Sequence, residues 1–355
     1  MPRPPSAPDL RRRRLVAQRL HRPSAATVGA LVRDLLAVQA QDQHAAALAL
    51  RARAPALTLT DVVDARRHGT VVITWLMRGT LHLVAVEDLG PLHTLTAERG
   101  AIGGERRLRQ LGVADAADDA VAVIEDAVAG GVPVSRPDIV RRLAKAGIPA
   151  DGQAPVHLIA LAARRRVCVL GVDAAGGPAY VPWPAQARAP VDRAGALAEL
   201  ARRYLRAHGP ATEDDLATWS GLPLRDVRAG LASIADGVTE LGGGLLDVAR
   251  PDTPEPVGPR LLPAFDPYLL GWRDRTFAVG AHGADVAPGG GVIRATVTVD
   301  GVAVATWRTQ RSGDTLRVAL DLFHPLRAAD TAALWADAQD VARFERRRLV
   351  SPAGP

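Results

Sequence analysis

The sequence is short of cysteine and of long apolar runs, and each scarcity excludes a class of protein. Cys168 is the single cysteine among 355 residues, so an intramolecular disulfide cannot form. No apolar run approaches the roughly 20 residues that a membrane-spanning helix requires. The N-terminal residues are rich in proline and arginine and lack the apolar segment of a secretory signal. We therefore expect a cytoplasmic protein without a membrane partner.

The signatures of several enzyme classes are also missing. The chain has no P-loop, no His-Glu-x-x-His, no Cys-x-x-Cys pair and no Gly-x-Ser-x-Gly elbow. The glycine runs at 242–244 and 289–291 precede no expected helix, so turns are a better interpretation than phosphate cradles. We expect no nucleotide hydrolysis, no metal site and no cofactor.

The net charge of +6 says little about nucleic-acid binding, because it comes from one end of the chain. Residues 1–22 hold seven arginines and one aspartate, which already gives +6, and the other 333 residues hold 37 basic and 37 acidic side chains. A DNA-binding surface must therefore come from the spatial arrangement of charges. The composition of residues 1–14 predicts a disordered or loosely docked basic tail.

Hydrophobic periodicity predicts the same local order three times, short helices followed by a strand hairpin. This order is typical of a winged helix, and an alternating stretch and a helical one follow it. We predict an α+β protein with three tandem winged-helix units, a small β-rich, barrel-like module and a C-terminal helix. The predicted segments are a tail at 1–14, units at 15–112, 113–190 and 191–250, a linker at 251–263 and the β-rich module with its helix at 264–355. The predicted helix caps are Ser24, Asp42, Thr60, Ser135 and Thr212, the last in a capping box with Asp215.

Polar side chains gather at residues 39–44, between two otherwise apolar helices. On spacing alone, an ordinary solvated turn with Asp42 as a helix cap is the favoured interpretation. Gln39 and Gln41 can share a small ligand only if the junction is extended, because side chains at i and i+2 then lie on the same side. Neutral amides can orient a water molecule but cannot accept its proton. Asp42 and His44 are the rival candidates, since either accepts a proton more readily.

Three stretches make the sequence resemble a known family. Leu36–Gln41 (LAVQAQ), Met77–Leu83 (MRGTLHL) and Leu261–Arg275 (LLPAFDPYLLGWRDR) are similar to landmarks of the winged-helix DNA glycosylases of the AlkZ/YcaQ type. The resemblance implies three winged-helix units in a C-shaped arrangement that lines a concave DNA-binding face. The implied partner is double-stranded DNA that carries alkylated bases or crosslinks, and we expect a monomeric, nucleoid-associated protein.

The resemblance also implies a site and a reaction. Gln39-Ala40-Gln41 matches the family motif Gln-Φ-Gln, and Gln41 places the chain in the AlkZ-like branch, because a carboxylate replaces this glutamine in the related branch. The implied reaction is hydrolysis of the N-glycosidic bond of alkylated purines such as N7-alkylguanine, with bulky natural-product adducts and interstrand crosslinks as further substrates, for DNA repair or antibiotic self-resistance. A lyase needs an amine, and the chain offers only Lys145 and the N-terminus; since the resemblance implies base hydrolysis alone, we expect no lyase activity.

DNA contacts are expected from arginines on helices and turns, because phosphate neutralisation supplies most non-specific affinity. The candidates are Arg51, Arg53, Arg78, Arg225 and Arg228. The main alternative is a non-catalytic winged-helix transcription regulator in which the two glutamines are polar turn residues. A protein-interaction scaffold without DNA affinity is a third interpretation.

Overall fold

The basic N-terminal stretch is helical. The computed structural model describes residues 4–22, 24–173, 177–248 and 255–350. Helix α1 (Ala7–Ala17) begins at Ser6, whose side chain accepts a hydrogen bond from the Asp9 N–H. Arg14 is 5% exposed, lies 4.6 Å from the centre of the Trp272 ring and donates to the Pro210 carbonyl. The expectation of a disordered tail at 1–14 is therefore wrong from residue 7 onward, because its arginines find partners elsewhere in the chain.

The first group has three helices and three strands. They are α2 (Val28–Leu35), β1 (Val38–Gln39), α3 (Gln43–Arg51), α4 (Leu59–Arg67), β2 (Val71–Trp75) and β3 (Leu81–Ala85). Asp42 caps α3 as predicted. The other two caps are Thr27 and Thr58 instead of Ser24 and Thr60. Thr58 is favoured because Asp61, three residues later, completes a capping box, whereas Thr60 has no acidic residue at that spacing.

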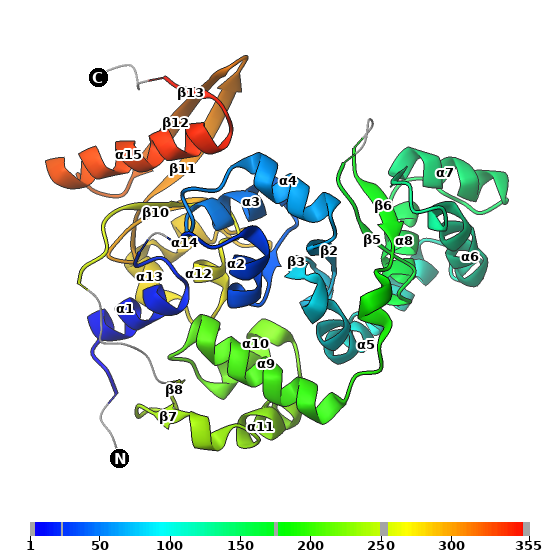
Figure 1. The fold of residues 1–355 in the computed structure, drawn as a ribbon, viewed down its shortest axis with the longest axis horizontal. Helices are drawn as coiled ribbons and strands as arrows, with labels where there is room; N and C mark the ends of the chain where they lie inside the picture. Colours follow the sequence, from blue (N-terminus) through cyan, green and yellow to red (C-terminus); the bar gives the residue numbers. More distant parts are fainter. Residues whose placement is uncertain (1–3, 23, 174–176, 249–254, 351–355) are drawn as a thin grey trace.

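The second group is joined to the first through one sheet (Figure 1). Its elements are α5 (Val86–Gln110), α6 (Ala117–Val128), β4 (Val134–Ser135), α7 (Arg136–Lys145), α8 (Ala154–Arg164), β5 (Cys168–Leu170) and β6 (Ala179–Pro182). The six strands run in the order β1-β3-β2-β5-β6-β4, and Ile73 of β2 pairs with Leu170 of β5. The hairpins of the two groups therefore form one continuous sheet instead of two separate wings.

The third group is a helix-turn-helix with a short hairpin. Its elements are α9 (Arg193–His208), α10 (Glu213–Ser220), α11 (Leu224–Ala232), β7 (Thr239–Glu240) and β8 (Leu246–Asp247). Thr212 and Asp215 form the predicted capping box. Gly221 ends α10 with a φ of 75°, a left-handed conformation that favours glycine.

The C-terminal part is a five-stranded half-barrel with helices around it. Its strands are β9 (Arg260–Leu262), β10 (Thr296–Val299), β11 (Val302–Ser312), β12 (Thr315–Leu322) and β13 (Arg348–Leu349), in the order β13-β12-β11-β10-β9. The helices are α12 (Pro267–Leu270), α13 (Thr276–Val279), α14 (Gly283–Val286) and α15 (Ala328–Phe344). Figure 1 shows α15 alongside the sheet. The predicted β-rich module and C-terminal helix are thus confirmed, while residues 251–254 of the predicted linker lie outside the described residues.

Two clusters of buried apolar side chains hold these elements together. The first chiefly joins the first two groups with the C-terminal sheet. The second joins α1, the third group and α12–α14 to α5 and to buried residues of β2 and β3. None of the described helices is both long enough and apolar enough to cross a lipid bilayer.

Candidate active site

The chain between α2 and α3 is extended at Gln39 and bends at Gln41. Helix α2 ends at Leu35, and the capping residue Leu36 has a φ of 67°. Strand β1 then pairs antiparallel with β3, with Gln39 opposite His82. The Ala40 N–H continues this pairing with a 2.7 Å hydrogen bond to the Leu81 carbonyl of β3. The helix therefore stops before Gln39 and does not resume until after Asp42.

Burial alternates along this segment. Val38 and Ala40 are buried, Gln39 is half-buried and Gln41 is exposed. The Gln39 side chain leaves the backbone on the side opposite Val38 and Ala40, and Gln41 follows at the bend that leads into α3. The extended junction at Gln39 is compatible with a small ligand shared by Gln39 and Gln41, and that shared site stays a prediction.

A polar row crosses the sheet beside Gln39. His82 on β3 and Thr74 on β2 are in register with Gln39, and directly opposed residues face the same side of a sheet. The His82 side chain is buried, and its Nδ1 lies 3.0 Å from the Thr80 carbonyl, to which it donates. Burial, reinforced by the charge of Arg78, lowers the pKa of His82 to about 3. His82 is therefore uncharged at neutral pH.

Arg78 connects the third group to Gln39. It lies in the turn η1 (Met77–Gly79) between β2 and β3. Its Nη1 donates to the Thr218 carbonyl at 3.2 Å and to the Trp219 carbonyl, both in the last turn of α10. Its Nη2 donates to Gln39 Oε1 at 3.4 Å. The guanidinium expected to contact DNA is thus engaged by protein groups, and no sequence pattern linked residue 78 to residues 218 and 219.

The two rival proton acceptors have structural partners. Asp42 Oδ1 accepts the Ala45 N–H at 2.9 Å and so acts as the cap of α3. His44 Nε2 lies 2.9 Å from Glu345 Oε1 and 2.7 Å from Arg311 Nη2. Burial alone would raise the pKa of Glu345, but hydrogen bonds from His44 and Arg311 outweigh it and lower that pKa to about 2. His44 therefore belongs to an ionic cluster that ties α3 to β11 and to the end of α15.

Two of the predicted DNA contacts are wrong. Arg51 and Arg53 are 1% and 0% exposed, because the end of α3 turns inward. Arg53 donates to both carboxylate oxygens of Asp266, at 2.8 and 2.9 Å. Arg51 donates to Asp337 Oδ1 at 2.6 Å and to the Leu261 carbonyl at 2.8 Å. Both guanidinium groups are buried and occupied, so neither can reach a phosphate.

Arg225 and Arg228 lie on α11, the second helix of the helix-turn-helix. Their side chains are 85% and 62% exposed. Arg228 forms an ion pair with Glu213 at 2.6 Å, and Arg225 lies 3.4 Å from Asp226. Both arginines are at the surface, where a DNA contact is sterically open, and that role stays a prediction.

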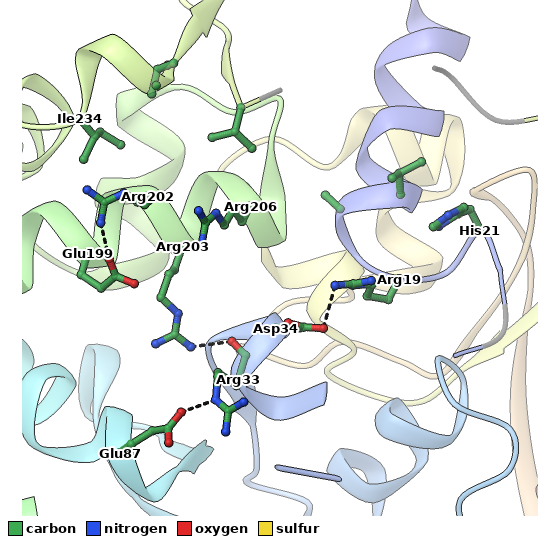
Figure 2. Close-up of a pocket in the computed structure, with 15 residues that line it drawn as sticks. Arg19, His21, Arg33, Asp34, Glu87, Glu199, Arg202, Arg203, Arg206 and Ile234 are labelled. Atoms are coloured by element: carbon green, nitrogen blue, oxygen red, sulfur yellow. Dashed lines mark hydrogen bonds and ion pairs between the residues drawn. The ribbon is translucent and has the colours of Figure 1, made fainter. Parts of the chain in front are cut away.

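A cavity of about 830 Å³ lies between the end of α1, α2 and α9 and contains none of residues 39–44 (Figure 2). Five arginines line it: Arg19, Arg33, Arg202, Arg203 and Arg206. Four of the five form ion pairs: Arg19 with Asp34, Arg33 with Glu87, Arg202 with Glu199 and Arg203 with Asp88. Because these carboxylates offset most of the positive charge, we assign the cavity no catalytic role. Among the residues that the structure describes, no cluster of three or more His, Cys, Asp or Glu side chains could hold a metal ion.

Comparison with known proteins bears on the family. The chain matches the family model described as "DNA glycosylase AlkZ-like" over residues 32–344. A curated protein from Streptomyces sahachiroi, "Interstrand DNA cross-link repair glycosylase", is 28% identical over 321 residues, which cover 80% of this chain and 82% of that protein. The solved structure "Streptomyces sahachiroi DNA glycosylase AlkZ" has a similar fold, with a TM-score of 0.78 and 23% identity over 98% of this chain and 100% of that chain. Since the family model spans most of the sequence, the protein belongs to the AlkZ-like family of DNA glycosylases.

Proposed function

We propose that this protein hydrolyses the N-glycosidic bond of alkylated purines of the N7-alkylguanine type in double-stranded DNA, and that Gln39 and Gln41 hold the attacking water. The observation that supports the proposal is that helix α2 stops before Gln39 and the chain is extended there, as a ligand shared by Gln39 and Gln41 requires. The curated relative is named for repair of interstrand cross-links, so we extend the proposal to crosslinks and bulky adducts, in repair or in self-resistance to a DNA-damaging product.

The chemistry of the leaving group makes two amides sufficient. Alkylation at N7 leaves a cationic purine, which takes the electron pair of the glycosidic bond and departs as a neutral base. No general acid is needed. The sugar becomes oxocarbenium-like, water forms the new bond to C1′, and its second proton passes to solvent. Gln39 and Gln41 contribute by orienting this water and by placing their dipoles near the developing charge.

The DNA would be held by exposed arginines. Arg225 and Arg228 lie on the second helix of a helix-turn-helix, the helix that approaches DNA in such motifs. Contacts to phosphates give binding that weakens steeply with salt and shows little sequence preference. Such binding supports association with the nucleoid, and we propose that the protein acts as a monomer.

The test compares single glutamine variants on duplexes with one N7-methylguanine or one crosslink. Under single-turnover conditions with saturating enzyme, we expect Gln39→Ala and Gln41→Ala to release base on the order of a hundredfold more slowly. Their DNA dissociation constants should stay within about twofold, since the amides contribute no charge. Gln43→Ala is the matched control, because Gln43 is the first residue of α3 and lies outside the extended pair. Full excision by both glutamine variants would rule out the site.

A regulator would behave differently in the same assay. It would prefer one undamaged duplex sequence and release no base from any substrate. That result would overturn the proposed function as a whole.

The proposal includes hydrolysis without strand cleavage. A lyase needs an amine to form a Schiff base, and Lys145, the only lysine, is exposed in the last turn of α7. We expect no covalent enzyme–DNA adduct on treatment with borohydride, and abasic sites that break only on heating or in alkali. A trapped adduct that disappears in Lys145→Ala would contradict monofunctional hydrolysis.

A further inference from the structure

Arg78 occupies a backbone position that disfavours it. The Thr80 N–H donates to the Met77 carbonyl at 3.2 Å and closes a four-residue turn between β2 and β3. The two central residues, Arg78 and Gly79, have φ values of 56° and 73°. Positive φ at both central positions is the pattern of a type I′ hairpin turn, in which asparagine followed by glycine is preferred. A side chain such as that of arginine is disfavoured there, so its presence calls for a reason.

The side chain provides that reason, because it spans two parts of the fold. Nη1 lies on the carbonyl groups of Thr218 and Trp219 at the C-terminal end of α10, where unpaired carbonyls and the helix dipole attract a cation. Packing there is close, since a Cβ at Gly221 would lie 3.2 Å from Arg78 Cγ. The other end of the guanidinium, Nη2, donates to Gln39 Oε1.

This bridge determines how the Gln39 amide is turned. A guanidinium can only donate, so the amide must present its oxygen to Arg78 and its NH2 group away from it. The oxygen keeps a second lone pair that can accept a proton of a water molecule. Without a partner, a half-buried glutamine would sample both amide orientations and several rotamers, and only some of them would hold the water.

We propose that Arg78 is a positioning residue that fixes the Gln39 amide for water binding and anchors it to the helix-turn-helix of the third group. This inference rests on the proposed catalytic role of Gln39. It assigns Arg78 a role in the rate of base release and not in DNA affinity. It also makes the end of α10 part of the support of the active site, although α10 and Gln39 are far apart in the sequence.

The experiment uses the full-length protein with Arg78→Asn, alone and combined with Gln39→Ala. Asparagine is the preferred residue at this turn position, which offsets the hydrogen bonds lost with the guanidinium, so the variant should fold with an unfolding midpoint close to that of the wild type. We expect single-turnover release of N7-methylguanine to slow about ten- to hundredfold, with the DNA dissociation constant within about twofold. Because both changes act through one amide, the double variant should be no more than about threefold slower than Gln39→Ala alone.

Two further variants complete the test. Arg67→Asn is the matched control, since Arg67 is 59% exposed, pairs with Asp64 within α4 and should leave the rate unchanged. Arg78→Lys should stay slow, because one ammonium group cannot bridge the carbonyls of α10 and the Gln39 amide.

The outcomes separate this inference from the proposed function. If Gln39→Ala keeps the full rate, the proposed catalytic site fails, and this inference fails with it. If Gln39→Ala is slow while Arg78→Asn keeps the full rate, only the role of Arg78 is overturned. The role of Arg78 is equally overturned if the rate reductions of Arg78→Asn and Gln39→Ala multiply in the double variant, or if Arg78→Lys has the full rate. It is also overturned if Arg78→Asn weakens DNA binding and leaves the rate of base release unchanged.

Discussion

The buried ion pair between Arg53 and Asp266 offers a test of the fold itself. All five N–H groups of Arg53 are used: Nε bonds the Gln18 carbonyl, Nη1 bonds Ala49 O and Asp266 Oδ2, and Nη2 bonds Gln18 Oε1 and Asp266 Oδ1, at 2.8 to 2.9 Å. Asp266→Asn keeps the size of the side chain and can still cap α12, because asparagine is a good N-cap. What it removes is the charge that compensates a guanidinium with no exposed surface.

The expected cost follows from that burial. Breaking a buried pair by neutralising one partner costs about 3 to 5 kcal/mol, a large part of a total stability of about 5 to 15 kcal/mol. For a chain of this size, the thermal midpoint should fall by roughly 4 to 7 °C. Calorimetry and urea unfolding of Asp266→Asn measure the change.

An exposed pair provides the control. Arg308 and Asp321 are each 59% exposed and lie 2.5 Å apart, so Asp321→Asn should cost less than about 1 kcal/mol. If Asp266→Asn is no more destabilising than Asp321→Asn, the reasoning about the buried pair is refuted. A loss of DNA affinity in folded Arg53→Met would instead revive the DNA contact that the sequence suggested for Arg53.

Two further predictions concern pH. Glu345→Gln should destabilise the protein by about 2 kcal/mol at pH 7, because it weakens charge-assisted hydrogen bonds from His44 and Arg311. The pKa of Glu345 is lowered to about 2, so the stability that its charge contributes is complete above pH 4.5 and lost as the pH falls towards 2. The free energies of unfolding of the wild type and Glu345→Gln should therefore converge in acid. Burial lowers the pKa of His82 to about 3, so folding requires the uncharged imidazole. The free energy of unfolding should be unaffected by His82 above pH 6.5 and should fall by about 1.4 kcal/mol per pH unit below pH 6.5. Urea titrations of the wild type and His82→Gln between pH 7 and 4 should differ by this slope, and parallel curves would contradict it.

Much of the fold could be predicted where local chemistry decides the structure. Asp42, Ser135 and Thr212 begin helices because their side chains satisfy free N–H groups a few residues later. Helix α5 could not be predicted, because Pro91 and several glycines interrupt the pattern of its first half and middle. Its stability comes from packing against α8 and α9, which no local pattern reports.

The sequence suggested the two candidate glutamines but not the partners of the side chains around them. The spacing of Gln39 and Gln41, with the family resemblance, led to the prediction of an extended junction, and the chain is extended at Gln39. Arg78, Arg53 and His44 each bond a residue more than 100 positions away in the sequence, namely Trp219, Asp266 and Glu345. Whether an arginine faces solvent or a distant carboxylate depends on those partners, and composition carries no information about them.

The shared six-stranded sheet has a consequence for how this chain can be divided. A truncation after the first group would remove β5 and leave β2 as an edge strand with unpaired N–H and C=O groups. Its residues Val71, Val72 and Ile73 are apolar, and an apolar edge of this kind invites pairing with another molecule. We therefore expect the first two groups to unfold as one cooperative unit, and neither group to be stable when it is expressed without the other.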